Sequence, residues 1–268
     1  LERLGVAPEA CVWVHAQNAK DAATRAWAAQ QGAWVELDGV GRERVLEELE
    51  ERVVLAARRQ DVHRGDASRL QPGADDNASG VAGMLGLARL FSKKPLEKTV
   101  RFVAFPLEEP PAYRSKNMGS YHYAASLQKA REQVEGMVCL EMIGFFSDRT
   151  GSQLYPLPFM KLKFPKTGNY ISMVGNRKSR TFTEGMATSF RKATDLPLVV
   201  LNAPSFVVGI DFSDHWSFNK FGIPAFMVTD TAFYRNPHYH GPSDLPETLD
   251  YVRMAQVVEG LSSAIEEW

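Results

Sequence analysis

The sequence is poor in the residues that build covalent or metal scaffolds. Only two of its 268 residues are cysteines, Cys11 and Cys139. That number excludes a disulfide-dense scaffold and a zinc module built from cysteines. The six histidines are too few for a histidine-rich metal tract. Any metal site in this chain must therefore take most of its ligands from carboxylates.

The chain also lacks an excess of either charge and any long apolar run. Lys and Arg total 31, Asp and Glu total 32, and the net charge is -1. This balance argues against binding to nucleic acid or to an anionic membrane, so we expect neither partner. No stretch approaches the roughly 20 apolar residues of a membrane span. The first residues, Leu1 to Leu4, show neither a signal-peptide pattern nor a Met, as expected for a mature or truncated chain.

What is present is the composition of an α/β enzyme domain. Apolar residues make up 44% and charged residues 24%, as in an average soluble globular protein. Short apolar segments alternate with amphipathic ones, which favours a sheet flanked by helices. We therefore predict a single domain over residues 1–268, with a three-layer α/β fold in which helices cover both faces of a central mixed, mostly parallel sheet. Strands are expected at 11–15, 34–37, 53–57, 99–105, 136–143, 171–174 and 224–229, and helices at 18–31, 42–52, 79–91, 120–134, 183–193 and 250–267.

Acidic residues follow several of these predicted strands. In open α/β sheets, functional groups gather beyond the carboxyl ends of the strands. Asp75 and Asp76 stand between a strand and a helix, and Glu108 and Glu109 follow the strand at 99–105. Taken alone, an aspartate here can cap the helix, and adjacent glutamates are usually solvated.

Two further features are harder to explain separately. Glu141 lies within an apolar run, where a carboxylate needs a cation or strong hydrogen bonds. The late segment Asn236 to His240 can be a plain polar turn, or it can supply an imidazole. Carboxylates and one imidazole that converge from separate strand ends suit a divalent first-row metal, zinc foremost. A further glutamate beside such a ligand can take a proton from water.

Five segments, in this order, resemble the co-catalytic zinc aminopeptidase family. That family includes bacterial leucyl-type aminopeptidases, glutamate carboxypeptidases and glutaminyl cyclases. The resemblance runs from about residue 53 to the C-terminus, and it implies a zinc exopeptidase-like fold, a peptide substrate and two zinc ions. The segments are GADDNASGVAGMLGLARLF (73–91), TVRFVAFPLEEPP and MGS (99–120), VCLEMIGFFSD (138–148), SDHWSF (213–218) and NPHYHGPSDLPETLDY (236–251).

The resemblance implies a set of metal ligands. Asp76 matches the aspartate that bridges two metals, and its peptide bond to Asn77 would be cis. Glu109 matches a ligand of one metal. Glu141 stands where the family usually has an aspartate ligand of the other metal, so its longer side chain must reach differently. His240 matches the last histidine ligand.

The resemblance also assigns roles around the ligands. Glu108 matches the general base that activates water. Tyr239 precedes the histidine ligand and is a candidate hydrogen-bond donor to an oxyanion. Asp214 and His215 match a pair of residues that stands behind the metal ligands.

The chain departs from the family at the first ligand. The family has a His-x-Asp motif directly after the strand predicted at 53–57, where this chain has Arg58-Arg59-Gln60-Asp61. The nearest histidine, His63, stands thirteen residues before Asp76, a spacing compatible with the family, but His63-x-x-Asp66 is one residue longer than the motif. His63 is therefore our candidate for that ligand. Without it one metal loses its imidazole, and the arginines would repel a second cation.

Three functions follow from these observations. The leading hypothesis is a zinc-dependent aminopeptidase that removes N-terminal residues from peptides, with Glu108 as the general base. The segments 145–168 and 196–212 are expected to shape its side-chain pocket, the first with Phe145, Phe146, Tyr155 and Phe159. One alternative is a one-metal enzyme like the glutaminyl cyclases. The other is a catalytically inactive binding or scaffold protein on the same fold, which the altered first-ligand motif favours.

Overall fold

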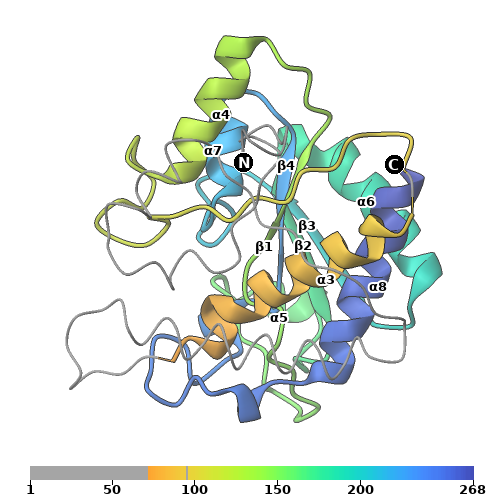
Figure 1. The fold of residues 1–268 in the computed structure, drawn as a ribbon. Helices are drawn as coiled ribbons and strands as arrows, with labels where there is room; N and C mark the ends of the chain where they lie inside the picture. Colours follow the sequence, from red (N-terminus) through yellow and green to blue (C-terminus); the bar gives the residue numbers. More distant parts are fainter. Residues whose placement is uncertain (1–71, 95) are drawn as a thin grey trace, which may run out of the picture.

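The computed structural model describes residues 72–94 and 96–268, and within them a four-stranded sheet forms the centre (Figure 1). The strand order is β1-β4-β2-β3, and the strands pair in parallel at β1–β4 and β2–β3 and antiparallel at β2–β4. Two of the three pairings are parallel, which confirms the predicted mixed, mostly parallel sheet. The strands are β1 (Met137–Leu140), β2 (Ile171–Asn176), β3 (Leu198–Ala203) and β4 (Ala225–Thr229).

Helices cover both faces of this sheet. In Figure 1, α4 and α7 lie on one side of the strands, and α6 and α8 lie on the other. Helices α3 and α8 pack against each other, as do α6 and α8. The layers are therefore the predicted three, and none of the described helices has the length and apolar character needed to cross a bilayer. The helices are α3 (Gly80–Ser92), α4 (Gly119–Ala130), α5 (Met160–Lys163), α6 (Arg180–Ala193), α7 (His215–Lys220) and α8 (Tyr251–Glu267), with short 3-10 turns at Arg177–Ser179, Ala232–Tyr234 and Pro246–Thr248.

The two faces of β4 show how the sequence separates these layers. Successive strand side chains point to opposite faces. Phe226 and Val228 therefore enter the main core with α3, α6 and α8. Ala225 faces the opposite way and joins a smaller cluster with α4 and α7. Met227, on the same face as Ala225 but nearer the carboxyl end, contacts a third cluster.

Most of the predicted elements inside the described residues are confirmed. The strands expected at 136–143, 171–174 and 224–229 are β1, β2 and β4, and the helices expected at 79–91, 120–134, 183–193 and 250–267 are α3, α4, α6 and α8. Strand β3 and helix α7 were not anticipated. The elements expected at 11–15, 18–31, 34–37, 42–52 and 53–57 lie outside the described residues, and the single domain over 1–268 stays a prediction.

The prediction of a strand at 99–105 was wrong: among the described residues this segment forms no strand. This segment is largely apolar, but it pairs with none of the four described strands. An apolar run becomes a strand only where a neighbouring strand satisfies its backbone hydrogen bonds. The preceding predicted strand, 53–57, is not among the described residues.

Gly80 sets how closely α3 approaches the end of β1. A Cβ atom at this position would lie 2.5 Å from the carbonyl oxygen of Leu140, a backbone atom that cannot turn aside. A Cβ atom at Gly83, on the same helix, would instead meet Cδ1 of Ile143 at 2.6 Å, the far end of a flexible side chain. The loop that precedes α3 can therefore reach β1 only because position 80 is a glycine.

We predict that Gly80→Ala lowers the free energy of unfolding by about 1–3 kcal/mol, the usual cost of overpacking, although alanine is the better helix former. Urea denaturation measures this loss. Gly83→Ala is the matched control and should cost clearly less, because the Ile143 side chain can move. Equal losses in the two variants would show that the backbone contact at Leu140 is not what matters.

Candidate active site

Asp76 lies in an irregular π-helical turn, Ala74–Ser79, that leads into α3 and is hydrogen-bonded to the carboxyl end of β1. The peptide bond between Asp76 and Asn77 is cis, as the family resemblance predicted. The Asn77 amide donates to the Leu140 carbonyl at 2.9 Å, and its Oδ1 accepts from the Met142 N–H at 3.0 Å. The loop and the residues after β1 are thus joined by hydrogen bonds in both directions, which fixes where Asp76 stands.

Two further aspartates connect this loop to the segment that carries the histidine. The carboxylate of Asp244 accepts from the backbone N–H groups of Asp75 and Asp76, at 3.0 and 3.1 Å. The buried carboxylate of Asp75 accepts from Gly144 N–H at 2.9 Å and from the Asn236 amide at 2.7 Å. Neither Asp75 nor Asp76 caps α3 through its side chain. Asp75 instead holds three loops together, and burial raises its pKa despite these hydrogen bonds.

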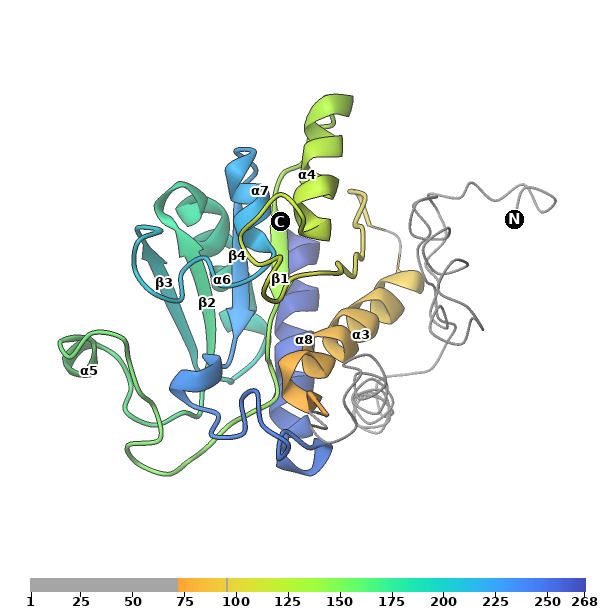
Figure 2. The same cartoon turned by 90° about the vertical axis from the view of Figure 1, so that its left-hand side faces the viewer.

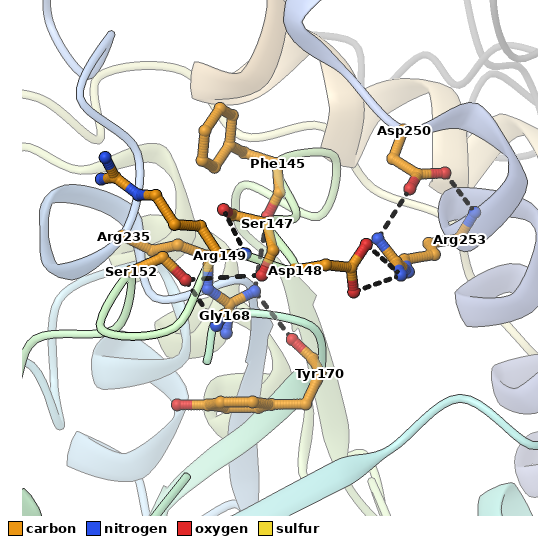
Figure 3. Close-up of polar contacts among 10 residues, drawn as sticks. All are labelled: Phe145, Ser147, Asp148, Arg149, Ser152, Gly168, Tyr170, Arg235, Asp250 and Arg253. Atoms are coloured by element: carbon orange, nitrogen blue, oxygen red, sulfur yellow. Dashed lines mark hydrogen bonds and ion pairs between the residues drawn. The ribbon is translucent and has the colours of Figure 1, made fainter. Parts of the chain in front are cut away.

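Arg235 is a buried arginine close to the Tyr170 ring (Figure 3). Arg235 donates Nε to the Gln153 side chain at 2.9 Å and Nη1 to the Tyr170 carbonyl at 2.7 Å, and its guanidinium lies 4.5 Å from the Tyr170 ring centroid. Asp230, the residue after β4, is fully buried and accepts from Phe145 N–H at 2.9 Å. Burial and the nearby Asp75 charge raise the pKa of Asp230 well above its ordinary value, and Arg235 opposes that rise.

Asp76, Glu109 and His240 form one cluster. Nε2 of His240 lies 2.9 Å from Asp76 Oδ2 and 3.2 Å from Glu109 Oε1. One possible ligand atom from each of the three residues falls within 4.8 Å of the other two. The two hydrogen bonds raise the pKa of His240 to about 10, so a positive charge is favoured between these carboxylates. Two carboxylates and one imidazole at this spacing are a donor set that fits a divalent ion such as zinc.

Glu108 and Glu141 surround this cluster with further negative charge. The pKa of Glu108 is raised to about 8. Burial is the largest cause, followed by the negative charges of Asp214, Glu109 and Asp76. Burial and the charges of Glu108 and Asp76 raise the pKa of Glu141 well above its ordinary value. Glu141 accepts a hydrogen bond from Ser213 Oγ at 2.6 Å and lies outside the three-residue cluster. It therefore lines the same site but is not one of the three residues whose ligand atoms lie together.

The remaining predicted residues divide between the site and its support. The Tyr239 ring stacks on His240 with centroids 3.8 Å apart, and burial followed by the charges of Asp76 and Glu109 raises the pKa of its hydroxyl. Asp214 directly precedes α7, and its negative charge contributes to the raised pKa of Glu108. His215 is buried, and its Nε2 lies 2.7 Å from the carbonyl oxygen of Ile210 in the loop that leads to α7. His63 lies outside the described residues, so its role stays a prediction.

A largely apolar pocket opens beside the cluster. Its volume is about 260 Å³, and Asp76, Glu109 and His240 form one part of its wall. Of the aromatics expected to shape it, Tyr155 lines the wall. Phe146 instead packs under the guanidinium groups of Arg235 and Arg253. The apolar wall comes from β2, β3, β4 and α5 and from the segments that follow β1, α5 and β3, with Met142, Met160, Phe164, Val174, Val199, Leu201, Val207, Ile210, Phe212 and Met227.

Comparison with known proteins identifies the family. Residues 47–265 match the family model for Peptidase family M28. The chain belongs to this family. Among curated M28-like relatives, the uncharacterized protein YfbL of Escherichia coli K12 is 45% identical over 199 residues, which cover 74% of this chain and 61% of YfbL. Aminopeptidase YwaD of Bacillus subtilis 168 is 29% identical over 75% of this chain and 39% of its own length.

Solved structures share the M28 fold. An aminopeptidase from Aneurinibacillus sp. strain AM-1 superposes with a TM-score of 0.50 at 29% identity, over 72% of this chain and 39% of that one. Legionella pneumophila LapA aminopeptidase gives 0.56 at 24%, over 74% and 48%. A glutaminyl cyclase of Fimbriiglobus ruber gives 0.50 at 22%, over 80% and 67%. The chain thus spans less than two thirds of these curated relatives and of both aminopeptidases, and the last two likenesses show the fold alone.

Three charged residues that support the site were not predicted from the sequence: Asp230, Arg235 and Asp244. Asp75 was considered only as a possible helix cap, and its contacts between loops were not predicted. For Asp230 a signal was present, because it follows the apolar run PAFMVT directly, just as Glu141 follows MVCL. For Asp244 no local pattern shows that its two oxygens accept from backbone N–H groups 168 and 169 residues away.

We predict that Asp244→Asn weakens zinc binding to the M28 chain by about 10–100-fold, the usual effect of losing a group that orients a ligand. Asparagine can accept with one oxygen only, so one of the N–H groups of Asp75 and Asp76 loses its partner. Competition with a zinc-binding dye measures the affinity. Asp148→Asn removes an exposed carboxylate that pairs with Arg253 and should leave the affinity unchanged. Equal affinities of wild type and D244N would contradict this role.

Proposed function

We propose that this chain is a zinc-dependent aminopeptidase that releases the N-terminal residue of peptides. The observation that carries the proposal is the cluster of Asp76, Glu109 and His240 beside an apolar pocket, with Glu108 at its edge. These three residues would hold one zinc ion, and Glu141 and His63 are the candidates for a second. A bound zinc ion supplies a Lewis acid that polarises the scissile carbonyl.

The side chains around the cluster transfer the proton, bind the oxyanion and hold the N-terminus of the substrate. Glu108 takes a proton from the attacking water as its oxygen bonds to the carbonyl carbon, and delivers that proton to the leaving amine as the C–N bond breaks. Tyr239, stacked on His240, presents its hydroxyl to the oxyanion. The positively charged N-terminus of the substrate is held by the carboxylates, with Glu141 on the wall of the pocket.

We predict that Glu108→Gln lowers kcat by about 10²–10⁴-fold, the range expected for loss of a general base, while the zinc content stays the same. Hydrolysis of aminoacyl amides measures the rate, and elemental analysis measures the metal. Glu259→Gln, an exposed position on α8, is the matched control and should keep full activity. A fully active E108Q variant would refute the proposed base.

The apolar pocket supports a preference for apolar N-terminal residues. A leucyl side chain has three more carbon atoms than an alanyl one, and each buried methylene stabilises by about 0.8 kcal/mol, so kcat/KM for leucyl amides should exceed that for alanyl amides by about 50-fold. Val174 lines this pocket and is 8% exposed.

We predict that Val174→Phe narrows the pocket and reduces the leucyl-to-alanyl ratio of kcat/KM by about 10-fold or more. The ratio is measured with the two amides on one preparation, so a loss of folded protein cancels. Val252→Phe, at a position that is 61% exposed on α8, should leave the ratio unchanged. An unchanged ratio in V174F would place the substrate side chain elsewhere.

One observation favours a second candidate, a one-metal enzyme like the glutaminyl cyclases. Within the described residues a single group of three ligands is close enough to share an ion, and Glu141 lies outside it. Release of ammonia from a glutaminyl peptide, without release of an amino acid, would favour the cyclase. Two zinc ions per chain would exclude the inactive scaffold, and a purified protein that binds no zinc would exclude both enzymes.

A further inference from the structure

The segment 149–168, which we call the arm, stands away from the body of the molecule. This segment lies between β1 and β2 in the sequence, and Figure 2 shows it reaching outward from the sheet, with α5 at its tip. Its base is closed by an antiparallel bridge between Thr150 and Thr167 and by a hydrogen bond from Gln153 N–H to the Lys166 carbonyl at 3.2 Å. The arm is therefore a closed loop whose tip has a definite conformation.

The tip has an inner face and an outer face. On the inner face Met160 is 6% exposed, and the Phe164 ring stacks with that of Tyr155, with centroids 5.8 Å apart. On the outer face Phe159 is 62% exposed and Leu162 is 88% exposed. The inner face alone secures the tip against the pocket, so the fold does not require the two outer side chains to be apolar. Exposed large apolar side chains that gather at one place mark an interaction site.

The arm is also strongly cationic. It carries Arg149, Lys161, Lys163 and Lys166, and no aspartate or glutamate, in a chain whose net charge is -1. The ion pairs that lysines form within the described residues are elsewhere, at Lys94, Lys98 and Lys192. Two of the arm's lysines directly flank Leu162. The near-zero total charge therefore conceals a local excess of positive charge around an apolar tip.

The shape of the tip decides between possible partners. Small molecules and peptides bind in concave sites, and the tip projects outward. A stable protein interface buries about 800 Å² on each side, which is more than a single turn of helix supplies. Apolar side chains surrounded by lysines suit a bilayer surface with anionic headgroups, where the apolar groups enter the interface and the cations meet the headgroups.

We propose that the arm docks this protein on anionic lipid surfaces, with Phe159 and Leu162 inserted and Lys161, Lys163 and Lys166 against the headgroups. The protein then lies on the bilayer and does not span it. Because the inner face of the same tip lines the pocket, docking holds the pocket close to the lipid surface. The inference does not depend on peptidase activity.

The test is co-sedimentation of the full chain with vesicles of phosphatidylcholine mixed with phosphatidylserine, and with vesicles of phosphatidylcholine alone. We expect binding to the anionic vesicles, weakened by added salt, and little binding to the neutral ones. Replacing the arm lysines (K161Q, K163Q and K166Q together) should weaken binding about 100-fold, since each lysine near the surface contributes about fivefold. The double variant Phe159→Ser with Leu162→Ser should also lose binding.

Matched controls change the same residue types outside the arm. Lys116→Gln with Lys129→Gln and Lys178→Gln removes three exposed lysines, and Val252→Ser removes an exposed apolar side chain. Both should bind anionic vesicles as wild type does, and all variants should share its melting temperature. Equal binding to neutral vesicles, or arm variants that bind normally, would overturn the proposal. So would a dimer of the wild type that dissociates in the F159S/L162S variant, because a second copy would then cover the tip.

Discussion

Repulsion among the carboxylates beyond β1 is the constraint that the rest of the site has to satisfy. Burial raises the pKa of both Glu108 and Glu141, and the negative charge of Asp76 raises both values further. Such a group of acids is tolerable only when protons, N–H donors or cations compensate its charge. His240 supplies one positive charge between Asp76 and Glu109. A divalent ion held by these three residues would bind the same nitrogen that carries this proton, so binding of the ion and loss of the histidine proton are linked.

The sheet topology produces this concentration of charge. Because β1 and β4 are parallel, their carboxyl ends meet at one edge, and the residues that follow them, Glu141 and Asp230, are both acidic. Strand β2 runs the other way, so the same edge receives the amino ends of β2 and β3. Their side chains on the pocket face, including Val174 and Leu201, are apolar. The same arrangement therefore places an acidic cluster directly beside an apolar pocket.

Much of this could be predicted from the sequence, because the strongest signals are local. Asp76, Glu109 and His240 stand in recognisable segments, and the structure brings them together. What could not be predicted depends on contacts between distant segments. The roles of Asp244 and Arg235 come from backbone groups that approach only in the fold. Strand β3 was missed because a short apolar run does not by itself indicate a strand or the strand it would pair with. Helix α7 was missed because its residues, HWSFNK, have only moderate helix propensity.

The total charge of the chain was the least informative of the sequence observations, and the structure shows why. A sum near zero describes a surface only when opposite charges are interspersed. Here negative charge is concentrated in a partly buried site, so it acts mainly on the groups that line that site. The lysines of the arm are exposed and project from the body, so they remain available to an outside partner. Each region serves a different proposed ligand: the acidic site suits a metal ion and a substrate amine, and the arm suits anionic surfaces.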